Sequence, residues 1–474
     1  MIPLTAATLP DLPAGIPGPR YDRARCTTGI VHFGVGGFHR AHQAMYIDRL
    51  MNAGKALDWA ICGVGVMPGD RRMNEILNAQ DGLYTLVVKA PDGTLTPRVV
   101  GSIREHLFAP DDPERVIRKL ADPAVRIVSL TVTEGGYAFP AADGTAGSMF
   151  ALITDALARR RESGTPPFTI MSCDNIQENG DTARRSFVAF ARRRDPGLAD
   201  WIAGHVRFPN SMVDRITPVT TDRDITEIGR RFGVHDRWPV VCEPFTQWVV
   251  EDDFSLGRPP LEDAGVQLAA DVRPYEMMKL RLLNAGHQAL CYFGHLAGYR
   301  LVHEVCQDRL FATFLLAYLD REARPTLAPV PGIDLAAYQR QLIERFSNAA
   351  VRDTVARLCA DTSDRIPKWV LPVIRHHLAT GGEIHRAAAV VASWARYAEG
   401  VDEHGAPIEV VDRLRDILMA NAGRQRADPL AFVAYREVFG DLVEHERFVS
   451  AYRAALASLH HRGARATLQW LVTP

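Results

Sequence analysis

The chain has 474 residues, of which 47% are hydrophobic and 23% charged, so it is long enough for two large globular domains. Lys and Arg number 55 against 56 Asp and Glu, and this net charge of -1 argues against a nucleic-acid partner. The seven cysteines are scattered without a C-x-x-C pair, which favours a cytoplasmic protein without a disulfide framework. Because no uncharged apolar run reaches about 18 residues, we expect no membrane span.

Strand-like and helical segments alternate through the first half of the chain, after a proline-rich N-terminal arm. Residues 30–33 form an apolar run that ends at a glycine turn, and a helical pattern follows. Further strand-like runs lie at 59–66, 83–89, 96–102, 125–132 and 168–173, with helical stretches at 38–51, 71–79, 113–120 and 150–161. The turn at 91–93 predicts a hairpin between its two flanking runs. The alternation predicts an α/β fold whose parallel sheet is covered on both faces.

The character of the chain changes near residue 275. A strand-like group over 239–250 precedes a polar, proline-rich stretch, and helical patterns rich in Leu, Ala and Arg dominate beyond Pro274. We therefore predict a dinucleotide-binding domain of Rossmann type over residues 1–275. A mostly α-helical domain for substrate binding and catalysis would occupy residues 276–474.

A glycine turn between a strand and a helix is the arrangement that holds the pyrophosphate of a dinucleotide. Gly34 and Gly36 supply the first two glycines of a G-x-G-x-x-G pattern, while His39 stands at the third position. Close packing of strand against helix without a ligand remains an alternative interpretation. Gly63 and Gly65 have the same spacing, but no helix begins directly after them, so we expect only tight packing there.

An acid after the second strand commonly binds the adenosine ribose, and Asp70 is the candidate. Its carboxylate would repel a 2′-phosphate, which favours NAD over NADP. Arg71 and Arg72 follow directly and could instead accept that phosphate. Asp70 could equally be the N-cap of the helix that begins at Arg71.

Residues 276–287 have a helical pattern, and four polar side chains share one broad face at about 100° per residue. These side chains are Glu276, Lys279, Asn284 and His287, mixed with leucines. Polar groups on an apolar face need partners or a function. One interpretation is a buried ion-pair network of Glu276 with Lys279. The other is hydride transfer from an alcohol, which requires a base for the hydroxyl proton and donors to the oxyanion.

The glycine-turn segment 34–44 and the spacing Lys279-x4-Asn284-x2-His287 together resemble the polyol-specific long-chain dehydrogenases, and most closely their mannitol branch. Residues 172–180 and 208–218 resemble the same family. The resemblance spans nearly the whole chain. It implies a metal-independent enzyme that uses NAD to oxidise a secondary hydroxyl of a polyol, for example D-mannitol to D-fructose.

The resemblance also implies a role for each matching position. Lys279 would be the general base, and Asn175 and Asn284 would stabilise the oxyanion. His287 would orient the substrate hydroxyls, and Glu276 would gate proton exit from the lysine. Cofactor contacts would come from Gly34, Gly36, Gly37, Phe38, His39, Arg40 and Asp70, and substrate contacts from Asp214, Arg357 and Arg365. Members of the family carry two consecutive acids after the second strand, and here Gly69 replaces the first.

The residues themselves leave other local interpretations open. Asn175 follows a buried strand and could cap the next helix. Asp214 beside Arg215 is typical of a surface ion pair. His39 and His42 have a metal-like spacing, but no third ligand is evident nearby, and we attribute the spacing to the cofactor turn.

Two other functions compete with a polyol dehydrogenase. A reductase of sugar acids such as fructuronate or tagaturonate would need an extra cation, which Arg357, Arg365 or Lys368 could supply. A non-catalytic NAD(H) sensor would keep the fold without turnover. A zinc alcohol dehydrogenase is disfavoured because no Cys, His and Glu set has a plausible spacing. The sequence leaves the oligomeric state open, a monomer included.

Overall fold

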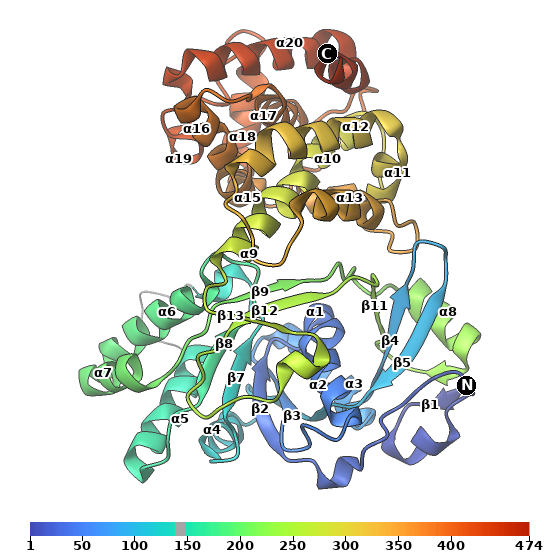
Figure 1. Cartoon of the computed structure of the whole chain (residues 1–474), viewed down its shortest axis with the longest axis vertical. Helices are drawn as coiled ribbons and strands as arrows, with labels where there is room; N and C mark the ends of the chain where they lie inside the picture. Colours follow the sequence, from blue (N-terminus) through green and yellow to red (C-terminus); the bar gives the residue numbers. More distant parts are fainter. Residues whose placement is uncertain (138–146, 474) are drawn as a thin grey trace. The chain divides into compact units, whose positions relative to one another are not determined.

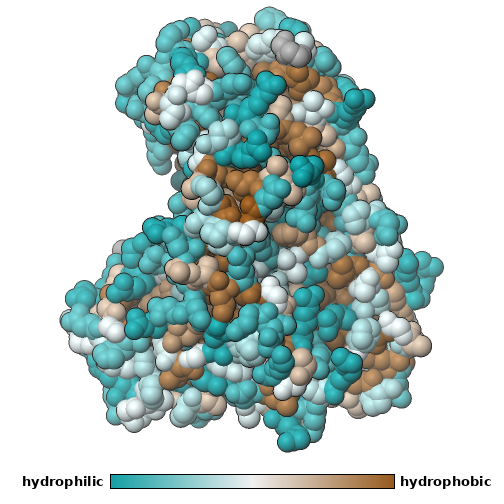
Figure 2. Space-filling view, viewed as in Figure 1, coloured by the Kyte–Doolittle hydropathy of each residue, from teal (hydrophilic) through white to brown (hydrophobic). Residues whose placement is uncertain are grey.

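The computed structural model describes residues 1–137 and 147–473. The chain divides into two compact units, Met1–Arg273 and Pro274–Pro474. Figure 1 shows that the first unit contains the sheets and that the second is built from helices. Hydrophilic side chains make up most of the face of each unit that Figure 2 shows. Within the described residues, no helix combines the length and apolar character needed to cross a bilayer.

The central sheet of the first unit has five parallel strands in the order β6-β3-β2-β7-β8. Their bounds are β2 Thr28–Phe33, β3 Ala60–Gly65, β6 Ile103–Phe108, β7 Ile127–Leu130 and β8 Thr169–Ser172. The order reverses between β2 and β7, which is where a doubly wound sheet binds its ligand, at the carboxyl ends of the strands. The predicted Rossmann-type parallel sheet is therefore confirmed.

Helices cover both faces of this sheet because alternate strand residues point to opposite sides. On one face Phe33 packs with Ile153 and Phe187, and on the other Ile30 packs with Ile47. The helices are α1 Gly37–Ala41, α2 Gln43–Asn52, α3 Arg71–Ala79, α4 Pro113–Ala121, α5 Met149–Ser163, α6 Asn179–Arg194 and α7 Pro196–His205. The single predicted helix over 38–51 is thus two helices, which separate at His42, where φ is −122° and ψ is −94°.

Smaller sheets complete the first unit. The predicted hairpin is confirmed as antiparallel β4 Tyr84–Lys89 and β5 Leu95–Val100, and β11 Val240–Cys242 pairs in parallel with β4. Strand β12 Gln247–Glu251 lies between β9 Ser211–Asp214 and β13 Gln267–Ala269. The N-terminal arm contributes β1 Ile2–Pro3, which pairs with β10 Val234–His235 beyond helix α8 Asp222–Phe232. The sequence analysis did not predict β6 or β9.

Within the described residues of the second unit, all the named elements are helices, joined by loops. Its α-helices are α9 Arg273–Met278, α10 Ala285–Leu296, α11 Val302–Gln307, α12 Arg309–Tyr318, α13 Leu335–Phe346, α14 Val355–Cys359, α15 Thr362–Trp369, α16 Leu371–Thr380, α17 His385–Tyr397, α18 Arg415–Arg424, α19 Arg436–Phe439 and α20 Glu446–Val472. Every residue of α10 is buried. A helix that is buried on all sides lies in the core, and α10 packs against α14 and α17.

Candidate active site

The glycine turn leaves β2 at the carboxyl edge of the sheet. Gly34 has a φ of +89°, and a Cβ there would lie 2.1 Å from the carbonyl oxygen of Thr131, so only glycine fits. Gly36 and Gly37 are different, because the nearest atoms to a Cβ would be 3.9 Å and 3.6 Å away. Their backbone therefore borders open space, which would allow a ligand to approach it closely.

Two stacked histidines support this turn from inside the protein. The rings of His32 and His39 lie 3.4 Å apart between centroids, and both residues are buried. Burial lowers the pKa of both, that of His32 to about 3, so neither carries the charge that would oppose stacking. His32 also hydrogen-bonds Ser129 at 2.8 Å and Thr131 at 2.9 Å. His39 thus fills the third glycine position as a packing residue.

The neighbouring predicted cofactor residues have protein partners too. Phe38 stacks on His42 with centroids 4.9 Å apart. The guanidinium of buried Arg40 donates to the carbonyl oxygens of Gly36 at 3.3 Å and Trp238 at 2.5 Å. The side chain of Arg40 therefore links the glycine turn to the backbone of Trp238 inside the protein.

Asp70 closes the turn after β3. Its Oδ2 accepts hydrogen bonds from the backbone amides of Val66 and Met67, both at 2.9 Å. Asp70 itself has helical dihedral angles and makes no capping bond to α3. Asp70 occupies the N-cap position of α3, as one interpretation expected, but its carboxylate points back toward the strand and does not cap the helix.

The glycines and arginines around Asp70 are engaged within the first unit. A Cβ at Gly63 would lie 2.6 Å from His106, and one at Gly65 would lie 2.6 Å from Asp70, which confirms the predicted tight packing. Arg71 forms an ion pair with Asp111 at 2.7 Å.

The loop after β8 carries Asn175, which is exposed four residues before α6. The N-cap position of α6 belongs to Glu178, so the interpretation of Asn175 as a cap is wrong. Asp214 ends β9 and is buried.

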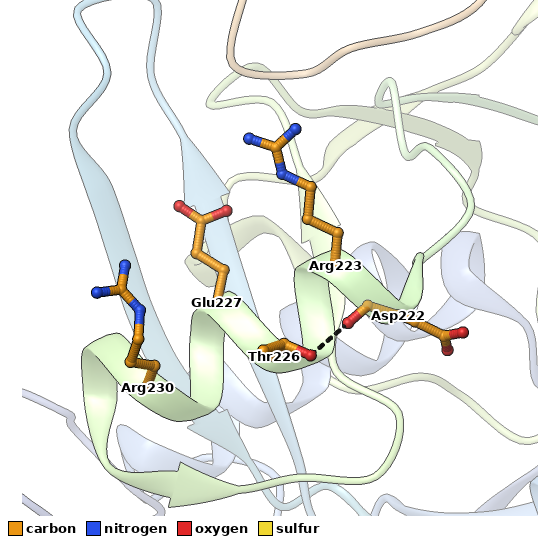
Figure 3. A pocket seen from close by; sticks show the side chains of 5 residues that line it. All are labelled: Asp222, Arg223, Thr226, Glu227 and Arg230. Atoms are coloured by element: carbon orange, nitrogen blue, oxygen red, sulfur yellow. Dashed lines mark hydrogen bonds between the residues drawn. The ribbon is translucent and has the colours of Figure 1, made fainter.

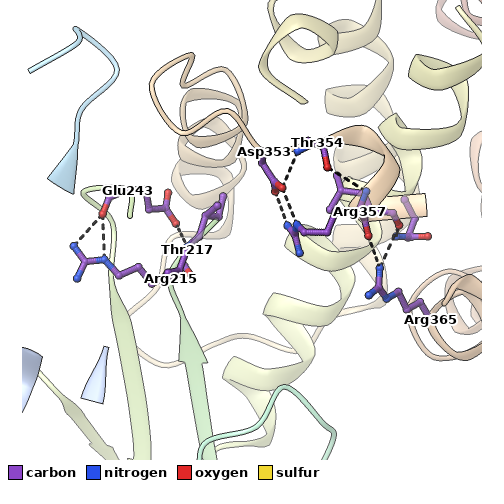
Figure 4. A network of polar contacts seen from close by, with 10 residues as sticks. Arg215, Thr217, Glu243, Asp353, Thr354, Arg357 and Arg365 are labelled. Atoms are coloured by element: carbon purple, nitrogen blue, oxygen red, sulfur yellow. Dashed lines mark hydrogen bonds and ion pairs between the residues drawn. The ribbon is translucent and has the colours of Figure 1, made fainter. Parts of the chain in front are cut away.

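Arg215 is also buried. Its guanidinium donates to the carbonyl oxygen of Glu243 at 3.0 Å (Figure 4) and to that of Ala41 at 2.7 Å. The expected surface pair of Asp214 with Arg215 is therefore wrong. The reason is that distant carbonyl groups satisfy this arginine inside the protein.

In the second unit, residues 276–287 do not form one regular α-helix. Between α9 and α10 lies a π-helical segment, Lys279–Asn284, in which hydrogen bonds span five residues. The prediction of a constant 100° per residue is therefore wrong across this segment. Glu276, Lys279, Asn284 and His287 are nevertheless all buried. Short π segments inside α-helices are frequent at functional sites.

An aspartate that the sequence analysis missed binds one of the two predicted substrate arginines, Arg357. Asp353 is buried, and Arg357 on α14 donates to its two oxygens at 2.7 Å and 2.5 Å (Figure 4). Arg365 on α15 donates to the carbonyl oxygens of Arg357 at 3.2 Å and Leu358 at 3.3 Å. The i, i+4 spacing of Asp353 and Arg357 on the chain is the signal that could have found the pair.

The charges around Asp353 fix its ionisation. Burial would raise the pKa of Asp353, but the hydrogen bonds and charge of Arg357, with the nearby His287, outweigh burial and lower it. The ring of His287 stacks on Phe346 with centroids 4.1 Å apart. The second unit thus brings Arg357 and His287 into one electrostatic environment around a buried carboxylate, and Arg365 contacts the backbone of the neighbouring helix α14.

The pocket shown in Figure 3 contains none of the predicted site residues. The pocket in Figure 3 is lined by Asp222, Arg223, Thr226, Glu227 and Arg230, all from α8. In the described parts of the chain, no three His, Cys, Asp or Glu side chains gather as they would around a metal ion.

Comparisons with known proteins match both units. Residues 28–263 match the mannitol dehydrogenase Rossmann domain, and residues 271–460 match the mannitol dehydrogenase C-terminal domain. A mannitol 2-dehydrogenase of Neosartorya fischeri is 44% identical over 95% of this chain and 94% of its own length. One from Pyricularia oryzae is 43% identical with the same coverage, 95% and 94%.

Solved structures of related dehydrogenases also match this chain over nearly its whole length. The mannitol 2-dehydrogenase of Pseudomonas fluorescens, in a ternary complex with NAD and D-mannitol, has a TM-score of 0.91 and 44% identity over 99% of both chains. A D-sorbitol dehydrogenase in substrate-free form has a TM-score of 0.86 and 37% identity, covering 99% of this chain and 100% of that one. This chain belongs to the mannitol dehydrogenase family.

Proposed function

We propose that this protein is an NAD-dependent polyol dehydrogenase that oxidises a secondary hydroxyl of D-mannitol or a related polyol to a ketose. The observation that carries the proposal is the buried set of Lys279, Asn284 and His287 on and beside the π-helical segment. The relative crystallised with NAD and D-mannitol, 44% identical over 99% of both chains, supports the same substrate class.

Residues 1–275 would bind the dinucleotide, and residues 276–474 would bind the polyol and supply the base. The amides of the turn at Gly36 and Gly37 would hold the pyrophosphate, because a ligand can approach their backbone closely. The carboxylate of Asp70 would accept hydrogen bonds from the ribose hydroxyls, and the backbone amides of Val66 and Met67 would hold it in place. When bound, NAD supplies the acceptor for the hydride that leaves the carbinol carbon.

Side chains of the protein would accept the proton of the reacting hydroxyl and stabilise the negative charge that develops on its oxygen. Lys279 takes the hydroxyl proton, and Glu276 passes it toward solvent. The side-chain amides of Asn284 and Asn175 donate to the oxygen as negative charge develops on it. His287 orients the neighbouring hydroxyls. In this scheme the lysine and the amides do the polarising, so no metal ion is required.

The contacts of Arg357 favour a neutral polyol over a sugar acid. A substrate carboxylate would need a cation whose charge is not already paired, and the charge of Arg357 is paired with the carboxylate of Asp353 through two hydrogen bonds. Arg365 likewise donates to two backbone carbonyl groups. Arg357 and Arg365 are therefore better suited to shaping a hydroxyl-binding surface than to neutralising an anionic substrate.

The test is nicotinamide absorbance with purified, EDTA-treated protein, NAD, and D-mannitol, D-sorbitol or D-arabinitol in turn. We expect NAD to be reduced by at least one polyol in the presence of EDTA. Silence with every polyol, but oxidation of NADH by fructuronate or tagaturonate, would identify a sugar-acid reductase. Silence throughout would identify a non-catalytic sensor, and activity that EDTA removes and zinc restores would refute metal independence.

A further inference from the structure

The loop after β7 contains a strained residue. Thr133 has a φ of +66°, a left-handed backbone that β-branched residues rarely adopt. It lies three residues beyond β7, at the carboxyl edge of the sheet next to β2. Such strain persists only where neighbouring groups impose it, and it is concentrated at ligand sites.

The side chain that holds Thr133 in this conformation is Asp174, two residues beyond β8. Its Oδ1 accepts from the amide of Thr133 at 2.7 Å, and its Oδ2 accepts from the amide of Val132 at 3.1 Å. The hydroxyl of Tyr137 also donates to Oδ2, at 2.6 Å. Asp174 is buried, so these hydrogen bonds replace the water that its carboxylate gives up.

The loop held by Asp174 reaches the glycine turn. The hydroxyl of Thr131 donates to the carbonyl oxygen of Gly34 at 2.7 Å, and the carbonyl of Thr131 faces Gly34 so closely that no Cβ fits between them. A shift of residues 131–133 would therefore shift the start of the glycine turn.

Asp174 also fixes the backbone next to Asn175. Its carbonyl oxygen accepts from the side-chain amide of Asn179 at 3.1 Å. The side-chain amide nitrogen of Asn179 also donates to the backbone carbonyl of Ser211 at 2.8 Å. The side-chain oxygen of Asn179 accepts from the backbone amide of Ser211 at 2.9 Å. Asn175, although exposed, is thus attached to a residue held through both its side chain and its carbonyl.

We propose that Asp174 is a positioning residue that ties the loop after β7 to the loop after β8, and so aligns the glycine turn with Asn175. Its carboxylate holds residues 132 and 133, which fix the turn through Thr131, while its backbone carries Asn175. This inference rests on the proposed roles of the turn in NAD binding and of Asn175 in oxyanion stabilisation.

The test begins with Asp174→Asn, which preserves size but turns one acceptor into a donor that faces another donor. We expect the Kd of NADH to rise and kcat with D-mannitol to fall, each by roughly tenfold, because the variant loses about one charged hydrogen bond. Tyr137→Phe is the matched control, because it removes a single hydroxyl and leaves both backbone amides bound to Asp174. Its effect on the Kd should be clearly smaller.

The decisive readout is rescue by Thr133→Gly. Glycine adopts a positive φ without strain, so the loop no longer needs the carboxylate to hold it. In the Asp174→Asn background, Thr133→Gly should restore most of the NADH affinity, whereas a residue that merely fills the core would not be rescued. NADH affinity that is unchanged in Asp174→Asn, or not restored in the double variant, would overturn the proposal.

Failure of a variant to fold and failure of the proposed function can each be distinguished from failure of this proposal. If Asp174→Asn alone does not fold, the double variant decides: a folded protein that binds NADH supports the proposal, and an unfolded one overturns it. Failure of the wild-type protein to oxidise any polyol would count against the proposed function. The rescue of NADH binding would still decide the role of Asp174, because that readout does not depend on turnover.

Discussion

Gly34 and Gly36 should respond in opposite ways to the same substitution. Gly34→Ala places a methyl group 2.1 Å from the carbonyl oxygen of Thr131 in a backbone with a φ of +89°. A left-handed conformation costs an L-residue about 1–2 kcal/mol, and relieving the overlap costs about 1–3 kcal/mol more. The first unit should therefore lose about 2–5 kcal/mol of unfolding free energy.

The expected loss is large enough to measure by calorimetry without ligand. At roughly 2 °C per kcal/mol for a unit of this size, Gly34→Ala should lower Tm by about 4–10 °C. Gly36 has an ordinary φ of −104°, and no atom lies within 3.9 Å of a Cβ built there. Gly36→Ala should therefore change the unfolding free energy by less than about 1 kcal/mol.

The two variants differ again in ligand binding. The methyl group of Gly36→Ala would project into the space that we assign to the pyrophosphate, so the Kd of NADH should rise by at least about tenfold. A fluorescence titration with NADH measures this. The reasoning would be refuted if Gly34→Ala melted like the wild type, or if the stable Gly36→Ala bound NADH normally.

Three further predictions concern charge. Because Arg357 and His287 lower the pKa of Asp353 below its ordinary value of 3.8, the ionised carboxylate stabilises the fold above that pH, and this contribution disappears as the pH falls through the lowered pKa. Asp353→Asn should therefore lower the free energy of unfolding in urea by about 1 kcal/mol at pH 7, a small value because Arg357 is 49% exposed. The difference between the variant and the wild type should vanish near pH 2, and a difference that stayed constant with pH would contradict this. Asp70→Ala should improve the Kd of NADP by about tenfold relative to NAD, and an unchanged ratio would remove Asp70 from cofactor selection. The rate of polyol oxidation should rise between roughly pH 6 and 10 as Lys279 loses its proton, so a flat profile would exclude it as the base.

The sequence predicted four of the five strands of the central sheet and missed β6, which lies at one of its two edges. Parallel strands buried on both faces are continuous apolar runs, which is why β2, β3, β7 and β8 were predictable. Strand β6 was missed because Arg104, Glu105 and His106 interrupt its apolar pattern. It is an edge strand, and Glu105 forms an ion pair with Lys119 of α4 at 2.5 Å.

The missed features of the site depend on contacts between residues distant in sequence. The burial of Arg215 depends on the carbonyl groups of Ala41 and Glu243, which no local pattern reveals. The π-helical segment was likewise not predicted, because the pattern of residues 276–287 fits a regular α-helix as well. The proposed catalytic roles of Lys279, Asn284 and His287 came from the family resemblance, since their spacing alone also fitted a buried ion-pair network.

The most direct test of the account compares wild-type protein with Lys279→Ala and the longer, uncharged Lys279→Met. Turnover of D-mannitol with NAD and the Kd of NADH are measured for all three. If Lys279 is the general base, kcat should fall by about 10²–10⁴-fold in both variants, with the Kd changed by less than about twofold. Turnover that survives in either variant, or NADH binding that disappears together with turnover, would contradict the assignment.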